Sequence, residues 1–171
     1  MWCLVFFESF YFVVKRLTEA ALSLEQKLAL RRTTWNLSGR NLNSEEMEFL
    51  LGNLISRTLS LEYIQSLNLS YNNLLNLPGL YLFPLESLTC LKVNDNRLSF
   101  LPKSMRWLKG LQEVDLRNNQ LKKLDVVREL PNLRKLLVEG NPLTLEEIRS
   151  LIKQVGTTTR KIFVDITGSI T

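Results

Sequence analysis

The chain of 171 residues contains no histidine. This absence excludes general acid/base catalysis by histidine, Ser–His or Cys–His nucleophile activation, and every zinc site that has a histidine ligand. Neither a G-x-x-x-x-G-K loop nor a G-x-G-x-x-G loop occurs, so the common phosphate-binding motifs are missing as well. We therefore expect a protein that is not an enzyme and that needs neither a cofactor nor a metal ion.

Cysteine is nearly absent too. Cys3 and Cys90 are the two cysteines of the chain, which is too few for a disulfide framework or a four-ligand metal site. Proteins that work outside the cell commonly use more cysteine, so this composition favours a reducing intracellular setting, cytoplasmic or nuclear.

No apolar run is long enough to cross a bilayer. The opening "MWCLVFFESFYFVV" is apolar except for Glu8 and Ser9 and is about 13 residues long, whereas a spanning helix needs about 20. Lys15 and Arg16 follow this run instead of preceding it, which is the wrong order for a signal peptide. We expect Trp2–Val14 to dock over the N-terminal end of the fold; the alternative is an anchor to a partner or a membrane.

The charge is uneven along the chain. The net charge is +5, and the whole excess lies in residues 101–171, where 13 Lys and Arg stand against 8 Asp and Glu. A basic half permits an acidic partner or a nucleic acid. An ordinary solvated surface is the simpler interpretation. In blocks such as "LKKL" and "LRKL" the cations lie between leucines, at positions that the repeat described below leaves exposed.

A repeated pattern is what the sequence does contain. The stretch "LNLSYNNLLNLP" (67–78) returns as "LKVNDNRLSFLP", "VDLRNNQLKKLD" and "LLVEGNPLTL". With the apolar residue three positions before each stretch, every copy has the form L-x-x-L-x-L-x-x-N-x-L. The aligned asparagines are Asn72, Asn96, Asn119 and Asn141. A looser first copy, "RTTWNLSGRNL", has Arg40 at the asparagine position, and the successive repeat steps are 32, 24, 23 and 22 residues.

The spacing within one copy explains the pattern. Two apolar residues two positions apart, such as Leu67 and Leu69, point inward from a short strand that pairs in parallel with its neighbours. The asparagine follows where the chain leaves the strand, and its amide can satisfy backbone groups that would otherwise be buried unpaired, at a cost of about 1–3 kcal/mol each. Arg40 cannot do the same, which suits a terminal repeat. A single repeat cannot bury its own apolar face, but stacked repeats can.

Helices are expected on both sides of the repeats. Leu17, Ala21, Leu24 and Leu28 form one apolar face of a capping helix. Residues 43–55 read as a helix that has Asn43 or Ser44 as its N-cap. Residues 144–156 read as a third helix.

The start of this third helix is a capping box of Thr144 and Glu147. Its apolar set is Leu145, Ile148, Leu151 and Ile152, and Gly156 is the expected stop. The run "KIFVDI" then predicts a sixth strand at the C-terminal edge, over Ile162–Ile166.

The pattern resembles that of leucine-rich repeat proteins over about residues 32–166. The segments "LPGLYLFPLESL" and "LPKSMRWLKGL" are similar to the Ras-group plant and animal intracellular repeats, and "LDVVRELPNL" to those of phosphatase-regulatory and spliceosomal members. The 32-residue first step resembles the ribonuclease-inhibitor type.

This resemblance implies an α/β fold: a right-handed, curved solenoid with short parallel strands on its concave face and helical caps. We expect an N-terminal segment and capping helix over residues 1–31, about five repeats over 32–143, and a C-terminal cap over 144–171.

Function is expected at the outward positions of the strands, since the inward positions are occupied by the core. We expect a scaffold, adaptor or regulatory subunit that binds a protein partner on the concave face. The predicted partner-binding residues are Lys92, Glu113, Asp115, Arg117, Lys135, Leu137, Glu139 and Phe163. The alternative is a ribonucleoprotein component that contacts nucleic acid through its basic C-terminal half.

Leu137 is the centre of this expected site, because an apolar side chain stands there where the pattern predicts a polar one. Aligning Val164 with Val138 puts Phe163 opposite Leu137, inside a charged rim, as in an interface hot spot. The alternative is that Phe163 folds over Leu137 and leaves nothing to bind. Glu113 and Asp115 read as recognition charges, because no catalytic partner accompanies them.

Two further residues carry weaker signals. Cys90 is a lone thiol, for which an idle cysteine is the default interpretation. Trp107 should lie on the convex wall, either packed near Phe83 and Pro84 or exposed as an anchor for a partner.

Overall fold

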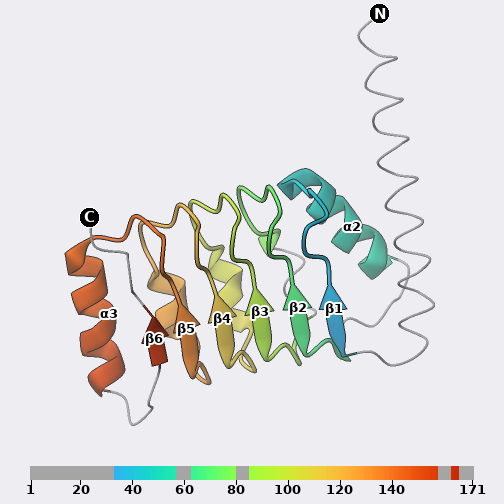
Figure 1. Ribbon diagram of the computed structural model, residues 1–171. Coiled ribbons are helices and arrows are strands. Elements are labelled where there is room, and N and C mark those ends of the chain that lie inside the picture. Colours follow the sequence, from blue (N-terminus) through green and yellow to red (C-terminus); the bar gives the residue numbers. More distant parts are fainter. Residues whose placement is uncertain (1–32, 57–62, 80–84, 158–162, 166–171) are drawn as a thin grey trace, which may run out of the picture.

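Six strands of three residues each form one parallel sheet in the order β1-β2-β3-β4-β5-β6 (Figure 1). Their bounds are β1 Thr34–Asn36, β2 Ser66–Asn68, β3 Cys90–Lys92, β4 Glu113–Asp115, β5 Lys135–Leu137 and β6 Phe163–Asp165. Each strand therefore pairs with the next one along the chain, as a solenoid requires. The sixth strand, expected within Ile162–Ile166, is confirmed.

This computed structural model describes residues 33–56, 63–79, 85–157 and 163–165. The predictions for Trp2–Val14 and for the helix containing Leu17 and Leu28 concern residues outside these ranges.

The central residue of each strand points into the core. Across the first five strands these residues are in register and at most 4% exposed: Trp35, Leu67, Leu91, Val114 and Leu136. The second inward position of each repeat is equally buried and belongs to the same continuous cluster, with Leu37, Leu69, Val93, Leu116 and Val138. The expected pair of inward residues two positions apart is therefore confirmed.

Short helical turns form the wall behind the sheet (Figure 1). Two of these turns are the 3₁₀ helices η3 Lys103–Trp107 and η4 Asp125–Glu129, which contact each other. Pro102 precedes η3 with a φ of −67°, where a missing N–H costs nothing. Met105 on η3 is fully buried in the core, so the wall closes the core from the convex side.

The asparagine ladder is present and each rung links two repeats. Asn96 donates through Nδ2 to the carbonyls of Val93 in its own repeat and Leu69 in the preceding one, both at 3.0 Å. Its Oδ1 accepts the Leu74 N–H at 3.0 Å. The same arrangement recurs at Asn72, Asn119 and Asn141.

All four asparagines are at most 8% exposed, so the polar atoms that they satisfy would otherwise be buried without partners. Arg40 is exposed and contributes only backbone here: its N–H donates to Asn72 Oδ1 at 3.1 Å.

The residue before each ladder asparagine adopts the left-handed backbone conformation. These residues are Tyr71, Asp95, Asn118 and Gly140, with φ between 53° and 70°; Gly39 holds the equivalent place before Arg40. Asn, Asp and Gly tolerate this conformation, whereas tyrosine does so at a cost. The turn after each strand therefore needs a residue with positive φ followed by the ladder asparagine. The repeat pattern predicts only the asparagine.

Helix α2 (Ser44–Ser56) lies at the β1 end of the sheet (Figure 1). Asn43 is its N-cap: Oδ1 accepts the Glu46 N–H, and Glu46 Oε2 accepts the Asn43 N–H, each at 2.9 Å. Ser44, the other N-cap candidate, instead accepts the N–H groups of Leu75 and Asn76 in the next repeat. It thereby ties α2 to that repeat.

Helix α3 (Leu145–Thr157) lies at the other end (Figure 1). Thr144 Oγ1 accepts the Glu147 N–H at 3.2 Å, so this half of the predicted capping box is present. The glutamate side chain does not return to Thr144. Its Oε1 accepts the Leu124 N–H at 2.9 Å and bonds Arg128 Nη2 at 2.7 Å, and so it anchors the cap to the last repeat.

Two further details of α3 differ from expectation. Ile148 and Leu151 are buried, but Leu145 and Ile152 are each 51% exposed, so the apolar face is narrower than the sequence predicts. The helix also runs through Gly156 to Thr157 instead of stopping there.

Candidate functional site

The outward positions of the strands form rows across the concave face. The first residue of each strand lies beside the first residue of its neighbours, and the third beside the third. The first-residue row is Thr34, Ser66, Cys90, Glu113, Lys135 and Phe163. The third-residue row is Asn36, Asn68, Lys92, Asp115, Leu137 and Asp165. Charge is therefore concentrated toward the C-terminal strands, as the sequence predicts.

Glu113 and Lys135 neutralise each other within the first-residue row. Lys135 Nζ lies 2.9 Å from Glu113 Oε1, and the lysine and glutamate side chains are 44% and 31% exposed. A pair this exposed contributes at most about 1 kcal/mol to stability. Both side chains remain accessible to a partner.

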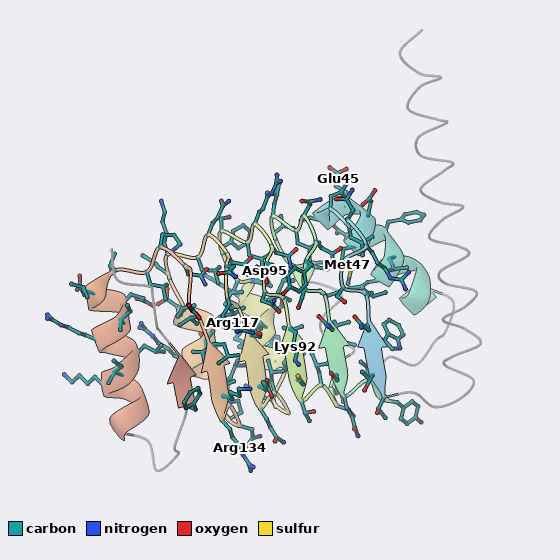
Figure 2. The ribbon with its side chains drawn as sticks, in the orientation of Figure 1. Glu45, Met47, Lys92, Asp95, Arg117 and Arg134 are labelled. Atoms are coloured by element: carbon teal, nitrogen blue, oxygen red, sulfur yellow. The ribbon has the colours of Figure 1, made fainter. Side chains whose placement is uncertain are left out.

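Asp115 forms an ion pair with Arg117. The carboxylate accepts Nε at 2.9 Å and Nη2 at 2.7 Å, and it also accepts the backbone N–H of Arg117 at 3.2 Å. Asp115 is only 3% exposed, so its charge is compensated and largely covered. The Arg117 side chain is 40% exposed and lies on the same face as Lys92 (Figure 2).

The predicted register of the last strand is wrong. Leu137 pairs with Asp165, and Phe163 pairs with Lys135, because β6 is shifted by two residues from the Val138–Val164 alignment. Alternation along a strand has a period of two, so a two-residue shift keeps the same side chains inward and the sequence pattern cannot detect it.

Leu137 is not the exposed apolar centre that the sequence suggested, since it is only 7% exposed. Phe163 is 61% exposed, which places the accessible apolar side chain of this face at the strand edge, beside Lys135. Glu139, just past β5, is partly exposed, and its side chain makes no hydrogen bond or ion pair among the described residues.

Cys90 is a half-buried free thiol in the first-residue row. Burial raises its pKa above the ordinary 9.0, more than the Ser66 hydrogen bond lowers it. A thiol with a raised pKa is mostly protonated at neutral pH and is a weak nucleophile, which agrees with the default interpretation.

Trp107 lies on η3, on the convex wall as predicted, and is 53% exposed. Arg106 and Lys109 lie 5.5 and 5.7 Å from its ring centroid, within range of cation–π contacts. Whether Trp107 packs on Phe83 and Pro84 concerns residues outside the described ranges.

One local feature of the face is not predicted by the repeat pattern. Asn36, Asn68 and Asp115, all in the third-residue row, accept through Oδ1 the backbone N–H two residues onward, at 3.0 to 3.2 Å. These are Asx turns. The signal in the sequence is an Asn or Asp between the two inward residues of a repeat, which spacing alone marks only as an outward polar position.

Other site types find no support in the part of the chain that the structure describes. Its Asp, Glu and Cys side chains form no group of three or more that could hold a metal ion. None of its helices is both long and apolar enough to cross a membrane.

Comparison with known proteins identifies the repeats. The family model described as "Leucine rich repeat" matches residues 86–143. A leucine-rich repeat protein of Leptospira interrogans is 31% identical and superposes with a TM-score of 0.56 over 65% of this chain. The chain therefore contains leucine-rich repeats.

Two further similar proteins match only part of the chain or only its fold. Internalin C2 of Listeria monocytogenes is 20% identical, with a TM-score of 0.52 over 64% of this leucine-rich repeat chain, and so supports the fold alone. An adenylate cyclase of Neurospora crassa is 39% identical over 85 residues, or 49% of this chain.

This leucine-rich repeat chain spans 4% of that cyclase, 27% of the Leptospira chain and 43% of the internalin chain. Matches this partial support the presence of leucine-rich repeats and do not assign a relative's activity to this chain. Leucine-rich repeats generally mediate protein–protein interactions, and proteins built from them are typically not enzymes.

Proposed function

We propose that this protein binds a partner protein through the C-terminal half of its concave face, as a non-catalytic scaffold, adaptor or regulatory subunit. The proposed site keeps the residues of the sequence prediction, of which Lys92, Glu113, Arg117, Lys135, Glu139 and Phe163 would touch the partner, while buried Asp115 and Leu137 would support them. Their roles differ now that their surroundings are known.

The observation that carries the proposal is the exposure of Phe163 beside a charged pair. Phe163 is 61% exposed and pairs in register with Lys135, which bonds Glu113. An accessible aromatic side chain within a charged rim is the usual anatomy of an interface hot spot. Phe163 therefore replaces Leu137 as the apolar centre.

The remaining residues supply shape and charge. Asp115 holds the Arg117 guanidinium through two hydrogen bonds, which pre-organises a cationic group on this face. Leu137, being buried, supports the sheet beneath the surface. Lys92 and Glu139 lie at the rim, where charges mainly set orientation and association rate.

Catalysis is not part of the proposal. The carboxylates of Glu113 and Asp115 are held in ion pairs, and burial raises the pKa of the Cys90 thiol, which makes that thiol a weak nucleophile. Scarce cysteine supports an intracellular location, in the cytoplasm or nucleus.

Site-specific photo-cross-linking tests the proposal. A photoreactive amino acid would replace Phe163 in one full-length variant and exposed Leu145 on α3 in a matched control. We expect one discrete protein adduct from position 163 in cell extract, none from position 145, and no change after nuclease treatment. Equal adducts at both positions, or loss with nuclease, would contradict it; the second result would favour the ribonucleoprotein alternative.

A further inference from the structure

The N-terminal half of the concave face, formed by β1, β2 and β3, meets the proposed site at Lys92 and differs chemically from the C-terminal half. Its first-residue row consists of Thr34, Ser66 and Cys90, and its third-residue row of Asn36, Asn68 and Lys92. No acidic side chain occurs among these positions, and Lys92 supplies the single charge.

The asparagines present donors to solvent, because their oxygens are already used. Asn36 Oδ1 accepts both the Ser38 N–H at 3.1 Å and the Ser38 hydroxyl at 2.6 Å. Asn68 Oδ1 accepts the Ser70 N–H at 3.0 Å. The backbone partner fixes which side-chain atom is oxygen, so the Nδ2 group must point away from it.

These donors have no partners in the part of the chain that the structure describes. None of Asn36 Nδ2, Asn68 Nδ2 and Lys92 Nζ makes a hydrogen bond or ion pair there, although neighbouring polar groups are paired. The three residues are directly adjacent on β1, β2 and β3, and adjacent strands lie about 4.8 Å apart. Asn36, Asn68 and Lys92 thus form a continuous donor row.

The surroundings favour a negative ligand. Asp115 is next in the third-residue row, but its carboxylate is buried and paired with Arg117. Ser70 and Asn94, just beyond the ends of β2 and β3, are buried and bonded to each other, so they do not compete for a ligand. Among the described residues, no carboxylate forms an ion pair with Lys92; the carboxylate of Asp95, three residues onward, accepts the side-chain amides of Asn94 and Asn118.

We propose that the donor row binds carboxylate side chains of an acidic segment in a partner protein. A carboxylate is acceptor-only and matches a row that offers only donors. A nucleic acid fits less well, because phosphate binding relies on several cations and base stacking on exposed aromatic side chains. The row has one cation, and the one aromatic residue within β1, β2 and β3, Trp35, is buried; the exposed Tyr63 and Tyr71 lie outside these strands. This inference rests on the proposal that the concave face binds a protein.

The test uses the full-length ¹⁵N-labelled chain and a blocked oligoglutamate peptide, with oligoglutamine and oligouridylate as comparison ligands. Side-chain amide signals of Asn36 and Asn68 report binding by NMR. We expect saturable shifts of both signals with oligoglutamate only. Shifts of equal size with oligoglutamine, tighter binding of oligouridylate at the same row, or oligoglutamate shifts confined to other residues would each overturn the proposal.

Asn68→Asp is the decisive variant. Asp115 shows that an aspartate makes the same Asx turn at the same row position, so the fold should persist while the donor is replaced by a carboxylate. We expect affinity for oligoglutamate to fall at least tenfold in Asn68→Asp and about threefold in Lys92→Gln, with no change in Lys103→Gln on the exposed surface of η3. Unchanged affinity in folded Asn68→Asp would overturn the proposal.

This experiment needs no native partner. If oligoglutamate binding fails while cross-links from position 163 persist, the donor row is wrong and the proposed function stands. If cross-linking fails as well, the proposed function is wrong.

Discussion

Asn119 Oδ1 accepts the backbone N–H of Leu98 at 2.9 Å, across 21 positions of the sequence and between two repeats. Through Nδ2 the same side chain reaches the carbonyls of Val93 and Leu116 at 3.0 Å. A single buried amide thus holds the polar backbone of two turns, so the stability of the stack should depend strongly on it.

Replacing Asn119 with alanine should lower the free energy of unfolding by about 1–3 kcal/mol, because buried backbone groups lose their partner. Arg40→Ala should cost much less, since Arg40 contributes only its backbone N–H to the ladder. Chemical denaturation of both variants decides this. Equal losses would mean that the ladder does not have the assigned role.

Gly140→Ala should destabilise more than Gly39→Ala. Both glycines have a positive φ, 70° and 64°, so each alanine carries about 1–2 kcal/mol of backbone strain. A Cβ at Gly140 would also clash with Asn118 Oδ1, whereas one at Gly39 meets nothing within 4 Å. Thermal unfolding measures the difference. Identical losses would show that Asn118 moves aside without cost.

Glu147→Ala should weaken the attachment of α3 to the last repeat. The carboxylate bonds the Leu124 N–H and Arg128 Nη2, and the side chains of Glu147 and Arg128 are only 14% and 19% exposed. We expect a loss of about 1.5–3 kcal/mol, as for hydrogen bonds to a charged group. Exposed Glu146 is the control, and Glu146→Ala should change stability little. Urea denaturation compares the two, and similar losses would contradict the anchor.

Cys90 should react slowly with iodoacetamide in a Cys3→Ser background. Burial raises its pKa above 9.0, so the thiolate fraction at pH 7–8 is smaller than in the unfolded chain. Because the thiol pKa is higher in the folded than in the unfolded protein, this group's contribution to folding stability is fully present below the pKa of the unfolded state. It decreases as the pH rises through the pKa of the folded state. Alkylation as fast as that of the denatured protein would contradict this.

The sequence predicted the elements that follow directly from its periodicity. Inward leucines, the asparagine ladder, the two helices predicted at 43–55 and 144–156 and the last strand are all present, each helix shifted by one residue, because each element is set by local spacing or by a cap. The positive φ of Tyr71 was not predictable in this way. Its residue type normally avoids that conformation, and the turn around it imposes the geometry.

The candidate site was predictable only in outline. Spacing identified which residues face outward, but not the two-residue shift that sets Phe163 beside Lys135, nor the burial of Leu137. The Asp115–Arg117 bond and the partners of Glu147 depend on side-chain choices among several polar neighbours. Such choices follow from three-dimensional packing and leave no periodic signal.

Partner affinity of Phe163→Ala tests the central claim most directly. With the partner identified by cross-linking, calorimetry would compare wild type, Phe163→Ala and Ile152→Ala, whose side chains are 61% and 51% exposed in the native protein. We predict that Phe163→Ala stays folded and loses about 2 kcal/mol or more of binding free energy, roughly a thirtyfold weaker Kd, while Ile152→Ala binds normally. Wild-type affinity in folded Phe163→Ala would contradict the concave-face site.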